Sequence, residues 1–510
     1  MPTKVLLTHT AALRAKYGRA GLNRVRDAAT HLAASDRARG LRTRWIALDD
    51  GRSARALRVR KVDDSSDHEG AKAFVDGLYA AWKPEYLVLL GSVDVVPMQP
   101  LRNPLYSRDP RRGDPDETIP SDLPYACEER FSLDPGRFRG PTRVVGRLPD
   151  TTGGDDVATL ERVLAVAARY EPSERRAYLP PFALTAAEWR GSSSLTLERL
   201  AGSADGLSEV PPAGPPWPAG ATRRLLHLVN CHGGAADWRY YGQRERSYPL
   251  ALDAGDLADG RLRERTVGTA ECCYGGMLYD PELAGGHAGF VDTYLAAGAY
   301  GYVAATNVAY GPANGNDGAD LVCRFFLQHV LGGASLGRAL LQARQDYVFQ
   351  KATLSPIDLK TLAQFTLYGD PSVHAVARPR VDAAAAPGEA VPKSRAVADA
   401  GPPEGVEARR RRLRANGRAL AASTTRASST PARLASGELS RIKTELSVRA
   451  GIETAAAELR TFDVVSAPAA AAGADERFHV LMERDRAGLR AVVAREEAGR
   501  MYGATVLRER

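Results

Sequence analysis

The segment Leu225-Leu-His-Leu-Val-Asn-Cys-His-Gly-Gly234 is an apolar run that ends in a tight glycine turn. A second segment of similar build follows it, Gly268-Thr-Ala-Glu-Cys-Cys-Tyr-Gly-Gly276. Such runs are typical of strands buried in a parallel sheet, which carries its functional residues at the carboxyl ends of the strands. His232 and Cys273 are 41 residues apart, which leaves room for one strand–helix–strand crossover. We therefore expect the two strands to be neighbours in one sheet.

A histidine and a cysteine at neighbouring strand ends are the groups that thiol-based acyl transfer requires. Cys273 would supply the nucleophile and His232 would carry the proton. Gly233 has no Cβ, so its N–H can face a substrate and form an oxyanion hole together with the Cys273 N–H. A histidine or a cysteine alone is more often structural, but the pair with both glycine turns favours catalysis.

The first 376 residues alternate between strand and helix patterns. Strand-like runs lie at 5–7, 86–90, 142–149, 225–230, 267–271, 299–305 and 364–371. Helical spacing is found at 18–35, 71–82 and 151–170, and as a pair of helices within 319–350. Segments 99–120 and 202–220 are rich in proline and polar or small residues and are predicted to be loops. This alternation predicts an α/β fold with a mostly parallel sheet flanked by helices.

The composition divides the chain into four parts. Residues 1–150 are predicted to form an N-terminal α/β subdomain, and residues 151–376 the catalytic subdomain. Residues 377–437 are dense in Ala, Pro, Arg and Ser, which is typical of a disordered basic linker. Residues 438–510 predict a small α+β domain, with a helix at 440–459 and strands at 477–483, 489–494 and 504–507.

Length and composition exclude several classes of protein. The chain has 510 residues, 44% of them hydrophobic, and contains no apolar run long enough for a transmembrane helix. The N-terminus has no signal-peptide core, and the five cysteines contain no Cys-x-x-Cys pair, so we expect a reducing, cytoplasmic location and no zinc site. The net charge of +8 is explained better by a solvated basic linker than by nucleic-acid binding.

The two glycine turns resemble those of the gingipain-like peptidases of the caspase–legumain–separase clan. Further segments resemble the family in the same order over roughly residues 70–376. They are Leu89-Leu-Gly-Ser-Val-Asp-Val-Val-Pro97, Ser121-Asp-Leu-Pro-Tyr-Ala126, Val145-Gly-Arg-Leu-Pro149, Gly298-Ala-Tyr-Gly-Tyr-Val303, Asn307-Val-Ala-Tyr-Gly311 and Leu367-Tyr-Gly-Asp-Pro-Ser-Val373. The resemblance implies a caspase-like core and a cysteine endopeptidase with a Cys–His dyad.

The resemblance also implies roles for single residues. The nucleophile of gingipains is the second of two adjacent cysteines, which favours Cys273 and leaves Cys272 to packing. Asp122 matches the acid at the floor of the S1 pocket, which implies cleavage after Arg or Lys. Tyr310 stands where the family has a tryptophan that lines S1, so the choice between Arg and Lys stays open. Asp94 is the candidate for a third catalytic group; capping of a turn is the alternative role for both aspartates.

Partners and cofactors follow from the same resemblance. We expect a protein or peptide substrate, no membrane partner, and a regulatory protein partner or an inhibitory role for the C-terminal region. No catalytic cofactor is implied; gingipains bind structural calcium, but no Asp-x-Asp-x-Asp loop is present here. The basic run Arg409–Arg414 is predicted to be a self-cleavage site. Two rival hypotheses are a catalytically silent scaffold and a nucleic-acid-binding protein that uses the basic tail.

Overall fold

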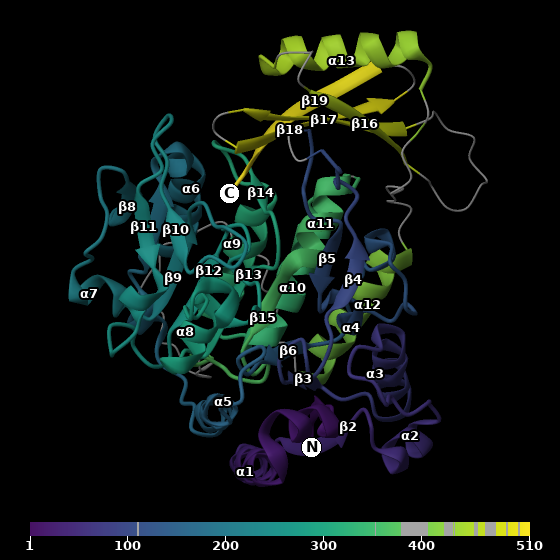
Figure 1. The fold of residues 1–510 in the computed structure, drawn as a ribbon, viewed down its shortest axis with the longest axis vertical. Helices are drawn as coiled ribbons and strands as arrows, with labels where there is room; N and C mark the ends of the chain where they lie inside the picture. Colours follow the sequence, from purple (N-terminus) through teal and green to yellow (C-terminus); the bar gives the residue numbers. More distant parts are fainter. Residues whose placement is uncertain are drawn as a thin grey trace, which may run out of the picture.

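A computed structural model describes residues 1–109, 112–351, 353–378, 406–422, 432, 434–452, 457–464, 476–485, 488–497 and 500–510. Its largest element is a ten-stranded sheet with the order β2-β1-β3-β6-β15-β13-β12-β9-β7-β8 (Figure 1). In chain order these strands are β1 (Thr3–Thr8), β2 (Arg42–Ala47), β3 (Tyr86–Leu90), β6 (Val145–Leu148), β7 (Phe182–Ala186), β8 (Leu207–Val210), β9 (Leu226–Asn230), β12 (Val267–Ala270), β13 (Gly301–Ala305) and β15 (Phe365–Tyr368).

Strand β15 runs opposite to its neighbour β13. These two strands pair antiparallel, whereas the other neighbours in the sheet pair parallel. Strand β15 meets β6 through a single residue pair, Tyr368 with Arg147, and the chain beyond β15 reaches the amino end of β1, where Asp370 pairs with Lys4. The loops that follow β3, β12 and β13 come together, because Val93, Tyr274 and Thr306 line one pocket.

Helices cover both faces of this sheet and divide the core into two large apolar clusters. One cluster includes side chains of α1 (Thr10–Ala38), α3 (His68–Trp82), α5 (Ala158–Ala168) and α8 (Phe290–Ala296). The other includes side chains of α6 (Arg190–Ala201), α9 (Ala319–Leu331), α10 (Leu336–Phe349) and α11 (Pro356–Gln364). Four shorter elements are α2 (Gly51–Leu57), α4 (Leu123–Ala126), α7 (Ala219–Thr222) and the β10–β11 hairpin (Arg239–Tyr241, Leu250–Asp253).

Small residues let strand β12 pass through this core. An ideal Cβ at Gly268 would lie 2.9 Å from the Tyr294 ring and 3.0 Å from the Tyr302 ring. Both distances are shorter than side-chain carbons normally tolerate, so only glycine fits there. This is why the strand leading to the cysteines has little of the bulky apolar character of its neighbour β9.

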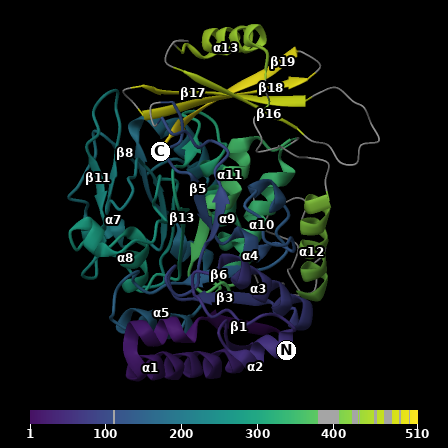
Figure 2. The same cartoon turned by 45° about the vertical axis from the view of Figure 1, so that its right-hand side comes forward.

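A five-stranded sheet of order β14-β19-β18-β17-β16 forms the C-terminal unit. Its strands are β14 (Tyr310–Gly311), β16 (Glu458–Asp463), β17 (Glu476–Asp485), β18 (Gly488–Glu497) and β19 (Arg500–Glu509). Helix α13 (Ser436–Ala450) covers the face turned away from the large sheet, through Ile442 and Leu446 (Figure 2). Because β14 follows β13 in the large unit, one continuous stretch of chain belongs to both sheets.

The α/β prediction is confirmed, together with the mostly parallel sheet and a C-terminal α+β arrangement. Three strands of the large sheet were not predicted, β2, β7 and β8, of which β8 lies in the predicted loop 202–220. Strands β10, β11, β14 and β16 were not predicted either. The predicted loop 99–120 contains the hairpin β4 (Gln99–Arg102) and β5 (Thr118–Ser121). The predicted helix 440–459 ends at Ala450, because the chain then enters β16.

The prediction of a disordered linker over 377–437 is wrong for its central part. Residues Val406–Ala422 form helix α12, which packs on α10. Leu413 of this helix is buried, and its carbonyl oxygen accepts a hydrogen bond from Gln345 Nε2 at 2.8 Å. An apolar stripe too short to stand out among so many arginines is sufficient to dock the helix. Residues 379–405, 423–431 and 433 lie outside the described part of the chain.

Candidate active site

His232 lies directly beyond the carboxyl end of β9, as predicted, and is held by backbone hydrogen bonds to Tyr241. Its imidazole packs between aromatic rings, with centroids 4.5 Å from Trp189 and 5.2 Å from Tyr248. Nε2 donates a hydrogen bond of 2.7 Å to Gln243 Oε1. This contact fixes the tautomer and leaves the lone pair of Nδ1 as the proton acceptor.

Burial, with a smaller effect of the positive charges of Arg510 and Arg508, lowers the pKa of His232 to about 4, against the opposing effect of the Gln243 hydrogen bond. The imidazole is therefore neutral at pH 7. A neutral imidazole is the form that can take a proton from a thiol.

The two adjacent cysteines belong to two different apolar clusters. Cys272 belongs to the apolar cluster with Tyr294 and Tyr302, and its sulfur accepts a hydrogen bond of 3.3 Å from the Cys231 N–H. Cys273 belongs to the other cluster, and its sulfur accepts a hydrogen bond of 3.2 Å from the Ala309 N–H. The two thiols therefore have different surroundings, as expected if successive side chains keep alternating in direction beyond the end of β12.

Gly233 lets the histidine turn and the cysteine turn approach one another. A Cβ at this position would collide with the carbonyl oxygen of Cys273. The strands that lead into the two turns are parallel neighbours, with Leu226 paired to Val267 and Val229 to Ala270. The expected proximity of the two turns is thus met, and glycine is the residue that permits it.

Asp94, the candidate third catalytic group, is not brought to the dyad. It follows β3, and four strands of the sheet, β6, β15, β13 and β12, lie between β3 and β9. Its Oδ2 pairs with Lys16 Nζ at 2.8 Å and accepts the Gly153 N–H at 3.1 Å. The group that orients His232 is instead Gln243.

Asp122 is already engaged in an internal ion pair. Arg147 donates from Nε to Oδ2 at 2.9 Å and from Nη2 to Oδ1 at 2.6 Å, and the Arg147 side chain has no exposed surface. Arg147 also binds the carbonyl oxygens of Gly91, Ser92 and Val96. Since both carboxylate oxygens are occupied by this arginine, the structure corrects the prediction that Asp122 receives the P1 side chain.

Tyr310 lies beside the cysteine turn but does not stack on an arginine. It is buried, its hydroxyl donates to Asp114 Oδ2 at 2.9 Å, and its ring centroid lies 5.3 Å from Lys360 Nζ. Its contribution to the site is made by the backbone, because Tyr310 and Gly311 form strand β14.

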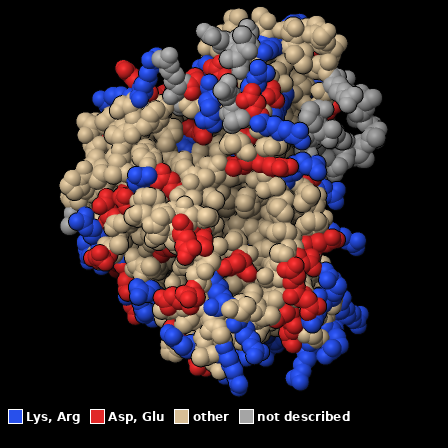
Figure 3. Space-filling view, viewed as in Figure 1, with Lys and Arg blue, Asp and Glu red and all other residues tan. Residues whose placement is uncertain are grey.

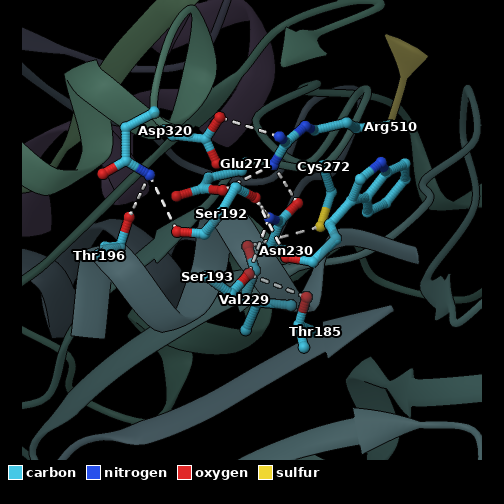
Figure 4. A network of polar contacts seen from close by, with 12 residues as sticks. Thr185, Ser192, Ser193, Thr196, Val229, Asn230, Glu271, Cys272, Asp320 and Arg510 are labelled. Carbon is cyan, nitrogen blue, oxygen red and sulfur yellow. Dashed lines mark hydrogen bonds and ion pairs between the residues drawn. The ribbon is translucent and has the colours of Figure 1, made fainter. Parts of the chain in front are cut away.

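An arginine of this same chain occupies a pocket beside Cys273. Arg510, the last residue of the sequence, is completely buried, and its guanidinium reaches Glu271, Asp320 and Asn230 (Figure 4). Nη1 donates to Glu271 Oε2 at 2.8 Å and to Asn230 Oδ1. Nη2 donates to Asp320 Oδ2 at 2.9 Å and to the Pro312 carbonyl at 2.9 Å. The guanidinium carbon lies 5.0 Å from the ring centroid of Trp189.

The backbone of Arg510 is aligned with the cysteine turn. Its carbonyl oxygen accepts a hydrogen bond of 2.8 Å from the Cys273 N–H, the group predicted to stabilise an oxyanion. Its N–H donates to the Ala309 carbonyl at 3.2 Å. One arginine thus has its side chain in an acidic pocket and its carbonyl oxygen hydrogen-bonded to the amide of Cys273, the predicted nucleophile.

Residues 230–376 match the family model described as "Peptidase family C25". The chain carries a peptidase family C25 domain. C25 enzymes are cysteine endopeptidases, so the resemblance to gingipains inferred from the two turns is confirmed, and a protein or peptide substrate is implied.

No curated protein matches the chain. One solved chain, titled "Structure of Protease", aligns with 100% of this chain and 97% of its own length, at 12% sequence identity and a TM-score of 0.44.

The acidic pocket of this C25 domain holds two carboxylates in contact with each other. Burial is the main cause that raises the pKa of Glu271, and the neighbouring charge of Asp320 adds to it. Burial also raises the pKa of Asp320, against the stabilising charge of Arg510. Two buried carboxylates that share one guanidinium are most stable when a single proton is bound between them. The pocket then has one net negative charge, which matches one arginine.

The surroundings of His232 and Cys273 contain residues that sequence reasoning missed. Glu271 stands two positions before Cys273 and directly after strand β12, so its place in the sequence could have indicated it. Trp189, Gln243 and Asp320 come from elements far away in the sequence and carry no local signal. Arg510 is one of many arginines in the C-terminal part of the chain.

The described residues contain no group of three or more His, Cys, Asp or Glu side chains that could hold a metal ion. None of the described helices is both long and apolar enough to cross a membrane. On the face drawn in Figure 3, Lys and Arg are interspersed with Asp and Glu around a largely uncharged centre.

Proposed function

We propose that this C25 peptidase cleaves peptide bonds after arginine, and that Glu271 and Asp320 form the floor of its S1 pocket. The observation that carries the proposal is the position of Arg510. Its guanidinium donates hydrogen bonds to both carboxylates, while its carbonyl oxygen accepts a hydrogen bond from the Cys273 N–H. A P1 residue needs both contacts at once, because the carbonyl must present its carbon to the thiol.

The reaction would follow the general course of thiol acyl transfer. His232 accepts the proton of Cys273 through Nδ1, and the sulfur attacks the P1 carbonyl carbon. The Cys273 N–H, together with the Gly233 N–H, stabilises the negative oxygen of the tetrahedral intermediate. The imidazolium then protonates the leaving amine, and the acyl-enzyme forms as the C–N bond breaks. Water, deprotonated by His232, hydrolyses the thioester and regenerates the thiol.

Preference for arginine over lysine follows from the number and direction of the acceptors. Nη1 and Nη2 of Arg510 reach different carboxylates, and Trp189 lies close to the guanidinium. A lysine ammonium is a compact charge that cannot bridge the same set or stack in this way. We therefore extend the prediction made from the sequence, which left Arg and Lys open, to a preference for Arg.

The experiment compares fluorogenic peptides that end in Arg, Lys or Gln at P1. We expect hydrolysis of the Arg peptide by the wild type and none by Cys273→Ala. In Glu271→Gln and Asp320→Asn, kcat/KM for the Arg peptide should fall by roughly 30-fold or more, the equivalent of about 2 kcal/mol for removal of one partner of a buried charged pair. Equal rates on the Arg and Gln peptides would contradict the proposal.

A further inference from the structure

The last three residues of the sequence lie along strand β14 as a peptide substrate would. Glu509 is paired with Tyr310, and Arg508 with Gly311, in antiparallel register. Arg510 extends this pairing: its N–H donates to the Ala309 carbonyl oxygen, and its own carbonyl oxygen accepts from the Cys273 N–H. The segment therefore combines β-strand addition to the edge of β14 with a side chain in the acidic pocket.

Strand β14 is shaped for this occupant. A Cβ at Gly311 would collide with the guanidinium of Arg510. The Arg510 side chain has no exposed surface, so no second arginine can enter the pocket while it is in place. The contact therefore excludes a substrate from S1 rather than lying beside it.

The C-terminal sheet holds this segment in its extended shape. Glu509 Oε2 accepts the Leu489 N–H at 2.7 Å and pairs with Arg484 at 3.0 Å, and Arg508 pairs with Asp485 at 3.4 Å. Leu507 is buried in the apolar cluster that this sheet shares with the large unit. The side chains before Arg510 are thus anchored on β17 and β18, and Arg510 alone reaches into the pocket.

We propose that residues Arg508–Arg510 act as an internal, substrate-like inhibitor of this peptidase. The inference rests on the proposed function, because it identifies Arg510 as a P1 arginine. A segment tethered within the same chain has an effective concentration of about a millimolar or more, so it competes strongly with dilute substrates. Activation then requires that the end of β19 leaves β14 and Arg510 leaves the pocket.

The experiment uses the full chain with an N-terminal tag, in four forms: wild type, Arg510→Ala, Arg510→Gln and Arg500→Ala. Arg500 is an exposed arginine at the first position of β19, the strand that leads to Arg510, and serves as the matched control because its substitution removes the same charge from the C-terminal segment. Each form is assayed with the Arg-ended peptide, and alkylation of Cys273 by iodoacetamide is timed by mass spectrometry. Thermal melts establish which variants fold.

We expect both Arg510 variants to lower the apparent KM for the peptide and to speed alkylation, each by about tenfold or more, as release of a millimolar internal competitor predicts. Arg500→Ala should behave like the wild type. A synthetic peptide of residues 500–510 should inhibit Arg510→Ala competitively, and the same peptide with alanine at its last position should not.

The outcomes separate the two proposals. If the Arg510 variants and the wild type have the same KM and the same alkylation rate, the internal inhibitor is refuted while cleavage after arginine stands. If a folded Arg510 variant alkylates faster but cleaves no Arg-ended peptide, cleavage after arginine is refuted instead, and the segment merely covers the thiol. Either Arg510 variant suffices for these comparisons if the other does not fold.

Discussion

At the scale of single residues, the choice between adjacent thiols is made by alternation. Cys272 and Cys273 belong to two different apolar clusters, and only Cys273 lies beside Arg510 and β14. Burial raises the pKa of the Cys273 thiol, and the nearby Glu509 carboxylate adds to this effect. The Cys273 thiol is therefore protonated at neutral pH while the C-terminal segment is in place.

Exchange of each cysteine for alanine should separate their roles. We expect Cys273→Ala to abolish hydrolysis of the Arg-ended peptide, because it removes the attacking atom. Cys272→Ala should keep kcat/KM within about threefold and lower the free energy of unfolding by ~1 kcal/mol, since it leaves only a small cavity. Steady-state kinetics and urea unfolding measure the two effects. Loss of activity in Cys272→Ala with normal stability would reverse the assignment.

Substitutions of Asp122 and Glu271 should separate a role in protein stability from a role in the choice of the P1 residue. Asp122→Asn leaves the guanidinium of Arg147 buried with reduced compensation, so we expect a loss of about 3 kcal/mol or more of unfolding free energy. The ratio of kcat/KM for Arg and Gln peptides should not change. Glu271→Gln should show the opposite result, with a reduced ratio. A changed ratio in folded Asp122→Asn would restore the role predicted from the sequence.

At the scale of elements, a docked helix replaces the flexible segment expected around Arg409–Arg414. Gln345 binds the Leu413 carbonyl, and Gly417 packs so closely that a Cβ would collide with the carbonyl oxygen of Pro141. Peptidases bind their substrates as extended strands, so a helix held in this way is a poor substrate. The structure thus argues against the self-cleavage site predicted in this run.

Incubation of the active enzyme tests this helix. We expect the wild type to stay intact between Arg409 and Arg414 while it hydrolyses the Arg-ended peptide. In Gly417→Val the helix should undock, because the collision with Pro141 cannot be relieved within the helix, and the run should become sensitive to trypsin. Fragment masses report the cuts. Rapid cleavage of the wild type within Arg409–Arg414 would show that the helix does not protect its arginines.

At the scale of the whole molecule, buried polar groups join segments that are far apart in the chain. Lys4 Nζ on β1 contacts Asp370 Oδ2 at 2.6 Å, beyond the end of β15, and also pairs with Asp36 Oδ2 at 2.5 Å. His227 on β9 is completely buried and contacts Tyr294 and two carbonyl oxygens. A histidine buried in this way makes the stability of the fold depend on pH.

Because His227 is buried, we expect the free energy of unfolding to fall in acid. Burial lowers its pKa in the folded state from 6.5 to about 4. The folded state therefore favours the neutral ring, and this contribution is complete above pH 6.5 and is lost as the pH falls toward 4. The loss amounts to about 3 kcal/mol of unfolding free energy.

Urea unfolding between pH 4 and 8 measures this effect. His227→Gln should flatten the decline by a similar amount, whereas His31→Gln, at an exposed position of α1, should leave it unchanged. An identical pH profile for the wild type and for folded His227→Gln would contradict the assignment.

Local sequence patterns predicted much of the fold and the positions of His232 and Cys273. The apolar runs with glycine turns predicted β9 and β12 as neighbours and put His232 and Cys273 at their ends, since strand period and turn chemistry are properties of adjacent residues. Strands β2, β7 and β8 escaped prediction. Arg42–Ala47 is half polar, and Leu207–Val210 is only four residues within a segment rich in proline and glycine.

The sequence by itself therefore determined the α/β class, the C25 resemblance and the positions of His232 and Cys273 beyond neighbouring strands. Only the tertiary structure decided which carboxylates meet beside Cys273. Four strands of the sheet separate β3, which Asp94 follows, from β9, and Arg147 occupies both carboxylate oxygens of Asp122. Glu271 and Asp320 converge on Arg510 across 190 residues or more of chain, because sheet order and strand direction, which no local pattern encodes, bring them together.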